Sequence, residues 1–309
     1  MFTEARLYSP VTRTGTGDVT VHLSEEHPGV HDRAYRARRN AIAAMALEYR
    51  PGDAPPPVDY TADEQRVWRT VSVELARKHR KYACAEIRAA AGRLALPTDR
   101  IPQLAEVGAA LAPLTGFRYV PAAGLVPLRE FFGSFAERVF HSTQYIRHHS
   151  APLYTPEPDA VHEIIGHATQ LASPRFAALY ETVGAAAARL RTERALKFLA
   201  DVFWFSLEFG VLREEGEIRC YGAGLLSSYG EIEEFRHAEL RPLDVWAMGA
   251  AAYDITHYQP VLYCAESLDE IEDVLGNFFA TMDDETPLRG NPLIRPATAD
   301  RLPTASAPD

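Results

Sequence analysis

A chain of 309 residues with 47% hydrophobic residues can bury a sizeable core, in one large domain or two small ones. Its formal net charge of -10 argues against a nucleic-acid partner, because binding phosphates requires a positive field. No segment approaches the roughly 18–20 apolar residues that span a bilayer, and the N-terminus lacks the apolar core of a signal peptide. The three cysteines are scattered, without a disulfide framework or a CxxC pair, so we expect a cytoplasmic protein.

The expected elements are mostly helices. Residues 1–28 are polar and weakly patterned, and they predict an N-terminal arm. A capping box at Thr61 and Glu64 begins a long helix that is expected to continue past Cys84. Besides the helix from Thr61, helices are expected at 32–50, 102–113, 128–139, 158–167, 173–190, 192–210, 242–251 and 267–282, and short strands at 117–120, 217–221 and 261–264.

These elements predict a mainly α fold with a few short strands. We expect one catalytic domain over residues 29–285, preceded by the arm at 1–28. Residues 286–309 are rich in Pro, Ala and Thr and are predicted to form a flexible tail, because they cannot bury enough apolar surface to become ordered.

The most informative segment contains two histidines, His162 and His167. In the HExxH motif of zinc proteases the histidines lie four residues apart on one helix face. Here the spacing is five, which separates the side chains by roughly 140° on an ideal α-helix. Both histidines can bind one ion only if the helix ends or bulges between them, and Gly166 is a candidate position for that irregularity.

A third ligand is expected from another element, and Glu208 is the best candidate. It is a lone carboxylate in an aromatic and aliphatic run, where an uncompensated charge is unfavourable. Two imidazoles and one carboxylate on one side of an ion form the facial triad of non-haem Fe(II) oxygenases. The residues alone leave open an Arg or Lys partner for Glu208, ordinary core or surface histidines, and a zinc hydrolase with Glu163 as base.

Several long segments around these residues resemble the biopterin-dependent aromatic amino acid hydroxylases, from about His27 to Ala280. The resemblance implies a mainly helical catalytic domain that uses Fe(II), tetrahydrobiopterin or a related reduced pterin, and O2. The matching segments are 27–29, 35–39, 101–104, 115–118, 140–148, 154–159, 208–210, 221–231, 258–260 and 265–267.

The resemblance also implies a role for individual residues. His162, His167 and Glu208 match the iron ligands, and Arg147 matches the arginine that binds the amino acid carboxylate, held by Asp159. Other substrate-site positions are Thr155, Pro156, Glu157, Trp204, Phe209, Ser227, Ser228 and Ile255. Pterin-site positions are Ala122, Gly124, Leu125, Phe131, Glu163 and Phe203. The pterin match is looser, because Pro127-Leu128 replaces a frequent Ser pair and Phe203 replaces a frequent Tyr.

Substrate choice is expected to favour phenylalanine. Trp204 argues against the tryptophan branch, and Ile255 stands where tyrosine-specific members usually have aspartate. Phe209 and Gly224 match para-hydroxylating members rather than meta-hydroxylating ones. The alternatives, in order, are tryptophan 5-hydroxylation and tyrosine 3-hydroxylation. A non-enzymatic alternative is an amino-acid-binding protein that has lost catalysis.

The oligomeric state follows from segments that the sequence lacks. We find no room for a regulatory domain before the catalytic segments and no heptad pattern after Ala280. We therefore expect a monomer or weak dimer.

Overall fold

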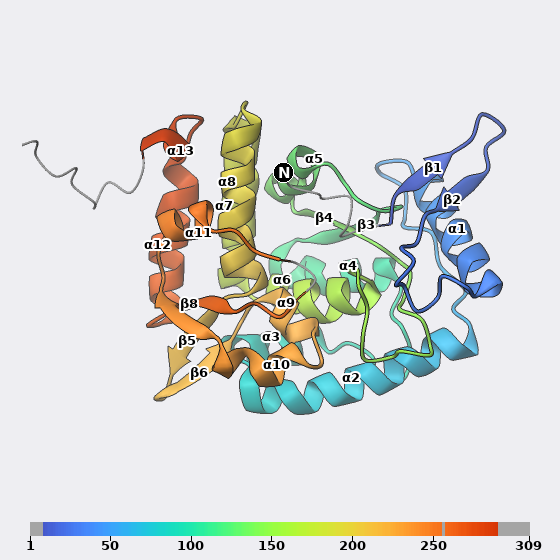
Figure 1. Ribbon diagram of the computed structural model, residues 1–309, viewed down its shortest axis with the longest axis horizontal. Coiled ribbons are helices and arrows are strands. Elements are labelled where there is room, and N and C mark those ends of the chain that lie inside the picture. Colours follow the sequence, from blue (N-terminus) through green and yellow to red (C-terminus); the bar gives the residue numbers. More distant parts are fainter. Residues whose placement is uncertain (1–8, 255–256, 290–309) are drawn as a thin grey trace, which may run out of the picture.

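The computed structural model describes residues 9–254 and 257–289, and it is mainly helical (Figure 1). This confirms the expected fold class. The α-helices are α1 (Arg33–Glu48), α2 (Ala62–Tyr82), α3 (Ala85–Leu94), α4 (Leu104–Thr115), α5 (Leu128–Ser134), α6 (Thr169–Leu171), α7 (Pro174–Arg189), α8 (Glu193–Phe203), α9 (Ala223–Ser227), α10 (Glu231–Glu234), α11 (Val245–Ala250), α12 (Leu268–Thr281) and α13 (Thr286–Arg289). Short 3-10 turns are η2 (Phe135–Glu137) and η5 (Phe235–His237).

The predicted capping box at the start of α2 is present. The Thr61 side chain accepts from the backbone N–H of Glu64, whose carboxylate accepts from the N–H of Thr61. The expected continuation past Cys84 is wrong. The chain becomes extended at Ala83, and the N–H of Cys84 bonds Cys220 O instead of continuing the helical ladder. A long-range backbone pairing thus divides a helical sequence into α2 and α3.

Two π-helical turns interrupt the helices that contain the candidate ligands. They are η3 (His162–Ala168), which continues into α6, and η4 (Trp204–Glu208), which follows α8 directly. π-helices bond residue i to i+5 and are rare outside functional sites. The predicted helices at 158–167 and 192–210 therefore exist, but their most important turns are wider than α-helical turns.

The strands form three small sheets. They are β1 (Val11–Arg13), β2 (Val19–Val21), β3 (Arg118–Pro121), β4 (Val139–Ser142), β5 (Val211–Glu214), β6 (Glu217–Cys220), β7 (Glu239–Pro242) and β8 (Val261–Ala265). The largest sheet has the order β6-β5-β8-β7, with only the β5-β6 pair antiparallel. Strands β3 and β4 form a parallel pair, and β1 and β2 an antiparallel hairpin.

The hairpin lies within the segment expected to be an arm. It packs against α1, where Val21 is buried and its N–H donates to Asn40 Oδ1 at 2.8 Å (Figure 1). Residues 11–21 therefore have regular structure that their polar sequence did not predict. The expected flexible tail began at residue 286, but residues 286–289 form the short helix α13, in which Thr286 is buried. The rest of that segment, from 290 onward, lies outside the described residues.

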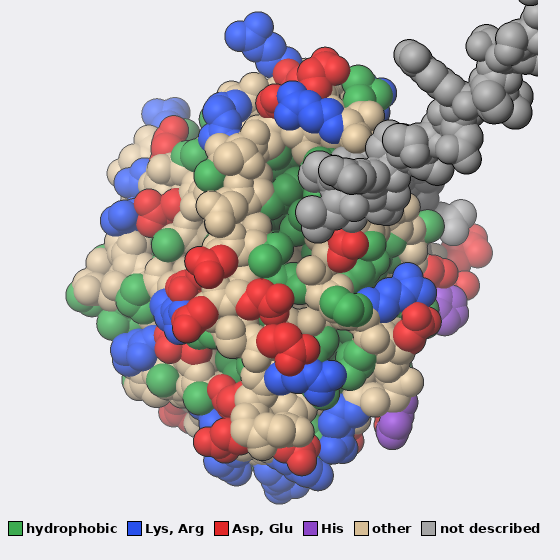
Figure 2. All heavy atoms as spheres, turned by 90° about the vertical axis from the view of Figure 1, so that its left-hand side faces the viewer, with side chains coloured by type: hydrophobic (Ala, Val, Ile, Leu, Met, Phe, Trp, Pro, Cys, Tyr) green, Lys and Arg blue, Asp and Glu red, His purple; other side chains and the backbone are tan. Residues whose placement is uncertain are grey.

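The surface carries mixed charge on the side of α12. Figure 2 shows acidic and basic side chains interspersed on this face rather than gathered by sign. Within the described residues, no helix has the length and apolar character needed to cross a membrane.

Candidate active site

The ring nitrogens of His162 and His167 converge with the carboxylate of Glu208. His167 Nε2 lies 3.0 Å from His162 Nε2 and 3.0 Å from Glu208 Oε1, and His162 Nε2 lies 3.7 Å from Glu208 Oε2. Two ligand atoms bound about 2.1 Å from one ion, at right angles, lie about 3.0 Å apart. The three side chains thus match one face of an octahedral site.

The π-turn η3 brings the two histidines together. Residues five apart are hydrogen-bonded neighbours in a π-helix, whereas an α-helix would turn them away from each other. The expected irregularity is present, but Gly166 is not a break in the helix. A Cβ at Gly166 would lie 2.7 Å from the carbonyl oxygen of Ala223, so this glycine permits close packing of η3 against α9.

Hydrogen bonds at Nδ1 fix both imidazoles. Nδ1 of His162 lies 2.9 Å from Ser227 Oγ, and that hydroxyl donates to the carbonyl oxygen of Ala223. Nδ1 of His167 lies 2.7 Å from the hydroxyl of Tyr180, which donates to Gln170 Oε1. A hydroxyl has only one proton to donate, and in each case it is donated to the carbonyl or amide oxygen. Each hydroxyl therefore accepts a hydrogen bond from the Nδ1–H of its histidine.

Since the proton of each imidazole is on Nδ1, no proton lies between the two Nε2 atoms and the Glu208 carboxylate, and all three groups are hydrogen-bond acceptors. Both Nε2 atoms carry lone pairs, and they converge on the Glu208 carboxylate. Burial lowers the pKa of His162 to about 4, against the attraction of Glu208, so this ring is neutral at pH 7. Burial works to raise the pKa of Glu208, and positive charge at the two histidines lowers it below its ordinary value; neutral rings do not supply that charge, whereas a metal cation held by them would. These protonation states are the ones that a metal cation requires.

Two cavities meet at Glu208 and Trp204, which line both of them. All six residues expected at a pterin site line the first cavity: Ala122, Gly124, Leu125, Phe131, Glu163 and Phe203. Eight of the residues expected at a substrate site line the second: Arg147, Thr155, Pro156, Glu157, Trp204, Phe209, Ser227 and Ser228. The structure therefore brings the predicted groups to two chambers that share one wall.

Arg147 and Asp159 form a buried ion pair beside the second cavity. Nε and Nη2 of Arg147 donate to the two oxygens of Asp159 at 2.9 and 2.8 Å, and the backbone N–H of Arg147 donates to Oδ2 at 2.8 Å. Asp159 is fully buried and does not line the cavity, whereas Arg147 does. The guanidinium is thus fixed in place and keeps N–H donors at Nη1 for a ligand.

Trp204 forms the centre of an aromatic wall. Its ring stacks on Tyr253 at 4.6 Å with a 12° tilt and contacts Phe209 at 4.6 Å on another side. Its indole nitrogen donates to Gln259 Oε1 at 3.3 Å. The Phe209 ring lies against Gly224, where a Cβ would approach it to 2.7 Å. This wall offers flat apolar surface to an aromatic ring in the second cavity.

Two expected pocket residues have other partners. The Glu157 carboxylate pairs with Arg39 at 2.6 Å and with His27 at 3.4 Å, and accepts two bonds from Ser9. The Thr155 hydroxyl donates to the carbonyl oxygen of Glu157, which is ordinary turn chemistry. Both residues line the second cavity, but the hydrogen bonds of their side chains hold the surrounding loop in place. Ile255 lies outside the described residues.

Glu163 lines the first cavity, where its side chain is buried. Burial, reinforced by the charges of Glu208 and Asp159, raises its pKa well above the ordinary value. The Thr143 hydroxyl lies 3.5 Å from its Oε1. A neutral carboxylic acid can both donate and accept a hydrogen bond, which suits a heterocycle with N–H and carbonyl groups.

Sequence reasoning missed His141 and Glu231. His141 lines the first cavity, and its buried Nδ1 has no hydrogen-bond partner among the described residues. Such an orphaned atom suits a polar ligand in that cavity. Glu231 lines the second cavity, where burial raises its pKa to about 7 although it accepts from the N–H of Gln259 at 2.7 Å. Both residues lie in segments that carry the family resemblance, 140–148 and 221–231, but a single polar residue carries no local pattern, so neither was given a role.

Comparison with known proteins identifies the family. The family model described as biopterin-dependent aromatic amino acid hydroxylase matches residues 13–298. The chain belongs to this family. The expected membership is confirmed, and dependence on a biopterin cofactor comes with it.

Relatives with different names resemble this chain. Phenylalanine 3-hydroxylase of Streptomyces coeruleorubidus is 50% identical over 260 residues, which cover 84% of this chain and 93% of that protein. Human phenylalanine-4-hydroxylase is 40% identical over 87% of this chain and 61% of its own length. Tyrosine 3-monooxygenase of Drosophila melanogaster is also 40% identical, over 87% of this chain and 48% of its own length. The chain thus spans about half to three-fifths of these animal relatives.

Solved structures of bacterial phenylalanine hydroxylases have the same fold. The Chromobacterium violaceum enzyme with bound iron(III) and 7,8-dihydrobiopterin matches with a TM-score of 0.69 and 26% identity, over 80% of this chain and 90% of that one. The cold-active enzyme of Colwellia psychrerythraea 34H matches with a TM-score of 0.69 and 29% identity, over 77% and 91%.

Proposed function

We propose that this protein is a phenylalanine 4-monooxygenase that converts free L-phenylalanine to L-tyrosine with Fe(II), a reduced pterin and O2. The observation that carries the proposal is the convergence of His162, His167 and Glu208 at the junction of two cavities. Three unprotonated acceptors at this spacing need a cation. Two histidines and one carboxylate on one side leave the opposite positions free, as non-haem iron oxygenases require.

The two cavities divide the reactants. Iron and reduced pterin together supply the activation of O2. In the first cavity, Glu163 and His141 offer hydrogen bonds to the edge of a pterin, and Phe131 offers an aromatic surface. In the second, Arg147 binds the amino acid carboxylate and Trp204 supports its ring. Because Glu208 lines both cavities, a metal held by His162, His167 and Glu208 would be reached from the substrate cavity and from the pterin cavity.

Phenylalanine is favoured over other aromatic amino acids. The rings of Trp204 and Phe209 contact each other and line the second cavity, which suits the aromatic ring of phenylalanine. Several relatives named as phenylalanine hydroxylases support the same choice. Tryptophan and tyrosine remain the alternative substrates within the family.

The position of hydroxylation has a specific rival. The Streptomyces relative, at 50% identity, is named a 3-hydroxylase. We favour the 4-position because Phe209 and Gly224 match para-hydroxylating members. The absence of a Cβ at Gly224 lets the Phe209 ring occupy the space above it, so this pair defines one wall of the ring pocket.

The deciding experiment is aerobic turnover by Fe(II)-loaded protein with a reduced pterin and each of the three aromatic amino acids. Chromatography that resolves para-tyrosine from meta-tyrosine tests both the substrate and the position. We expect para-tyrosine from phenylalanine and none from the Glu208→Ala variant. Meta-tyrosine would show hydroxylation at the 3-position instead of the 4-position, and 5-hydroxytryptophan would show that tryptophan is the substrate. No product from any of the three amino acids would overturn the proposal.

Two expectations complete the proposal. The three cysteines are free and buried, which supports a reducing, cytoplasmic location. A monomer or weak dimer is expected, and a stable tetramer in gel filtration would contradict it.

A further inference from the structure

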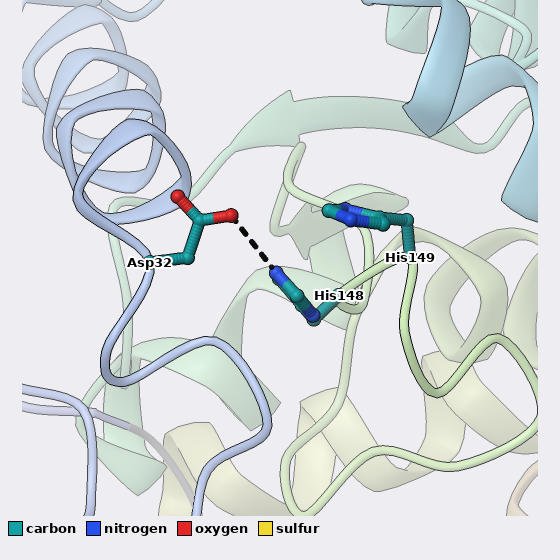
Figure 3. Close-up of side chains that lie close together, drawn as sticks. All are labelled: Asp32, His148 and His149. Carbon is teal, nitrogen blue, oxygen red and sulfur yellow. Dashed lines mark hydrogen bonds and ion pairs between the residues drawn. The ribbon is translucent and has the colours of Figure 1, made fainter.

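A second group of metal-ligating side chains lies away from the two cavities. Asp32, His148 and His149 each offer a ligand atom, and these atoms all lie within 4.8 Å of one another. Asp32 is the N-cap of α1, and the histidines belong to the loop after β4 (Figure 3). Figure 3 shows the Asp32 carboxylate facing the His148 ring, with the His149 ring beside it. Neither cavity is lined by any of the three.

We propose that Asp32, His148 and His149 form a second binding site, for a divalent transition-metal cation of the zinc class. The distance between His148 Nε2 and Asp32 Oδ2 is 3.2 Å. Two ligand atoms about 2.0–2.1 Å from one Zn²⁺, at the tetrahedral angle, lie about 3.3 Å apart. The pair therefore already has the spacing of two zinc ligands.

The carboxylate is oriented before any metal binds. Asp32 Oδ1 accepts from the backbone N–H groups of Ala34 and Tyr35 at 2.8 and 3.1 Å, as a helix cap. The other oxygen, Oδ2, is turned toward His148. One oxygen thus holds the side chain in place while the other is presented as a ligand.

The His148 ring is held in the same way. It is 7% exposed and packs edge-on against Tyr35, with ring centroids 4.9 Å apart. Nδ1 lies 2.7 Å from Ser150 Oγ. A hydrogen bond at the second ring nitrogen is typical of metal-ligating histidines.

Binding needs a change of tautomer that the loop can accommodate. In the metal-free protein Nε2–H donates to Asp32, and Nδ1 accepts from the N–H of Ser150 at 3.3 Å. When a cation takes Nε2, the proton leaves Nε2 and solvent returns a proton to Nδ1, so the ring stays neutral with one N–H and no net proton is released. Ser150 Oγ can either donate or accept, so Nδ1 keeps a partner in both states.

His149 supplies the third ligand and the route of entry. Its ring lies 4.2 Å from that of His148 and is exposed to solvent. Three protein ligands leave a coordination position for water. Two imidazoles and one carboxylate suit Zn²⁺, Cu²⁺ or Ni²⁺ better than Mg²⁺ or Ca²⁺, which prefer oxygen ligands.

Metal counting tests the site in the full-length protein. The chain is dialysed against micromolar free Zn²⁺, and bound zinc and iron are counted by mass spectrometry. We expect two metal equivalents in the wild type, one of them in the site of His162, His167 and Glu208, and one equivalent in His149→Ala. His237→Ala is the matched control, because His237 is also exposed and pairs with a single carboxylate, Glu234, at 2.9 Å. It should keep two equivalents.

A second variant separates metal binding from folding. Asp32→Asn keeps an oxygen that can cap α1 but loses the charge, so it should retain a folded helix and lose the second equivalent. Zn²⁺ should also raise the Tm of the wild type more than that of His149→Ala. One equivalent in the wild type, or two in His149→Ala, would overturn the proposal.

Discussion

The Asp159 carboxylate accepts three hydrogen bonds from Arg147, two from the guanidinium and one from the backbone N–H. Both residues are almost fully buried, so the arginine has little freedom to reorient. Its direction is therefore set before a substrate arrives, which lowers the entropy lost when an amino acid binds.

Arg147→Lys tests this arrangement. Lysine keeps the positive charge but cannot donate two parallel bonds to Asp159 while also reaching a ligand. We expect the KM for phenylalanine to rise at least about 10-fold, since a charge-assisted hydrogen bond contributes about 1.5–3 kcal/mol. The KM for the pterin, measured in the same assays, should change little. An unchanged KM for phenylalanine would contradict the assigned role.

Ser227→Ala should weaken iron binding. The hydroxyl of Ser227 accepts from Nδ1–H of His162, and loss of such a partner typically lowers metal affinity by about 10–100-fold. Ser228→Ala is the matched control, because the neighbouring hydroxyl contacts the backbone N–H of Glu231 at 3.3 Å instead. Competition with a chelator measures both. Equal iron affinities of the two variants would show that the bond to His162 is unimportant.

The contribution of Glu231 to the free energy of unfolding should decrease as the pH rises. Its folded pKa of about 7 lies above the ordinary value of 4.5, so between these values the folded state holds a proton that the unfolded state has released. The free energy of unfolding therefore falls between about pH 4.5 and 7, by at most ~3 kcal/mol. Below this window the contribution of the protonated acid is fully present.

Glu231→Gln removes that dependence, because glutamine stays neutral and can still accept from Gln259. At pH 8 we expect urea denaturation to show the variant more stable than the wild type, with the difference vanishing near pH 4.5. Glu217→Gln serves as a control, since Glu217 is exposed. Parallel pH profiles for wild type and Glu231→Gln would refute the assignment.

Gly166→Ala should destabilise the protein and loosen the metal site. The added Cβ would lie 2.7 Å from the backbone oxygen of Ala223, so η3 and α9 must separate. Strain of this kind costs about 1–3 kcal/mol. We expect a lower Tm and weaker iron binding, because α9 also carries Ser227. Gly92→Ala, where nothing lies within 4 Å of the added atom, should be neutral or stabilising.

Local patterns predicted the helices well, because capping and apolar spacing act over a few residues. Thr61 and Glu64 marked the start of α2, and the five-residue spacing of His162 and His167 required an irregular turn. Contacts between segments that are distant in the chain could not be predicted from these local patterns. The division of the helix at Cys84 depends on Cys220. The predicted helix at 128–139 ends early, because Arg138 adopts a positive φ of 54°.

The candidate site divides in the same way. The resemblance located residues of both cavities and placed Glu157 at a pocket-lining or supporting position, but it did not indicate that the Glu157 carboxylate binds Arg39, from a segment 118 residues away. Glu231 gained its raised pKa from burial that only the folded chain creates. Residue type and order can identify a site, but the partners of a buried charge depend on packing.

The π-turn η3 has a genetic consequence. Loss of one codon, for Ile164 or Ile165, would shorten the spacing between the histidines to four and leave His-Glu-x-Gly-His. That order has the spacing of a zinc-protease helix, in which ordinary α-helical geometry keeps both imidazoles on one face. Everything C-terminal to the deletion would rotate by roughly 100° about the helix axis, and Gln170 would leave its partners. A single inserted residue thus separates the geometry of an oxygenase from that of a hydrolase.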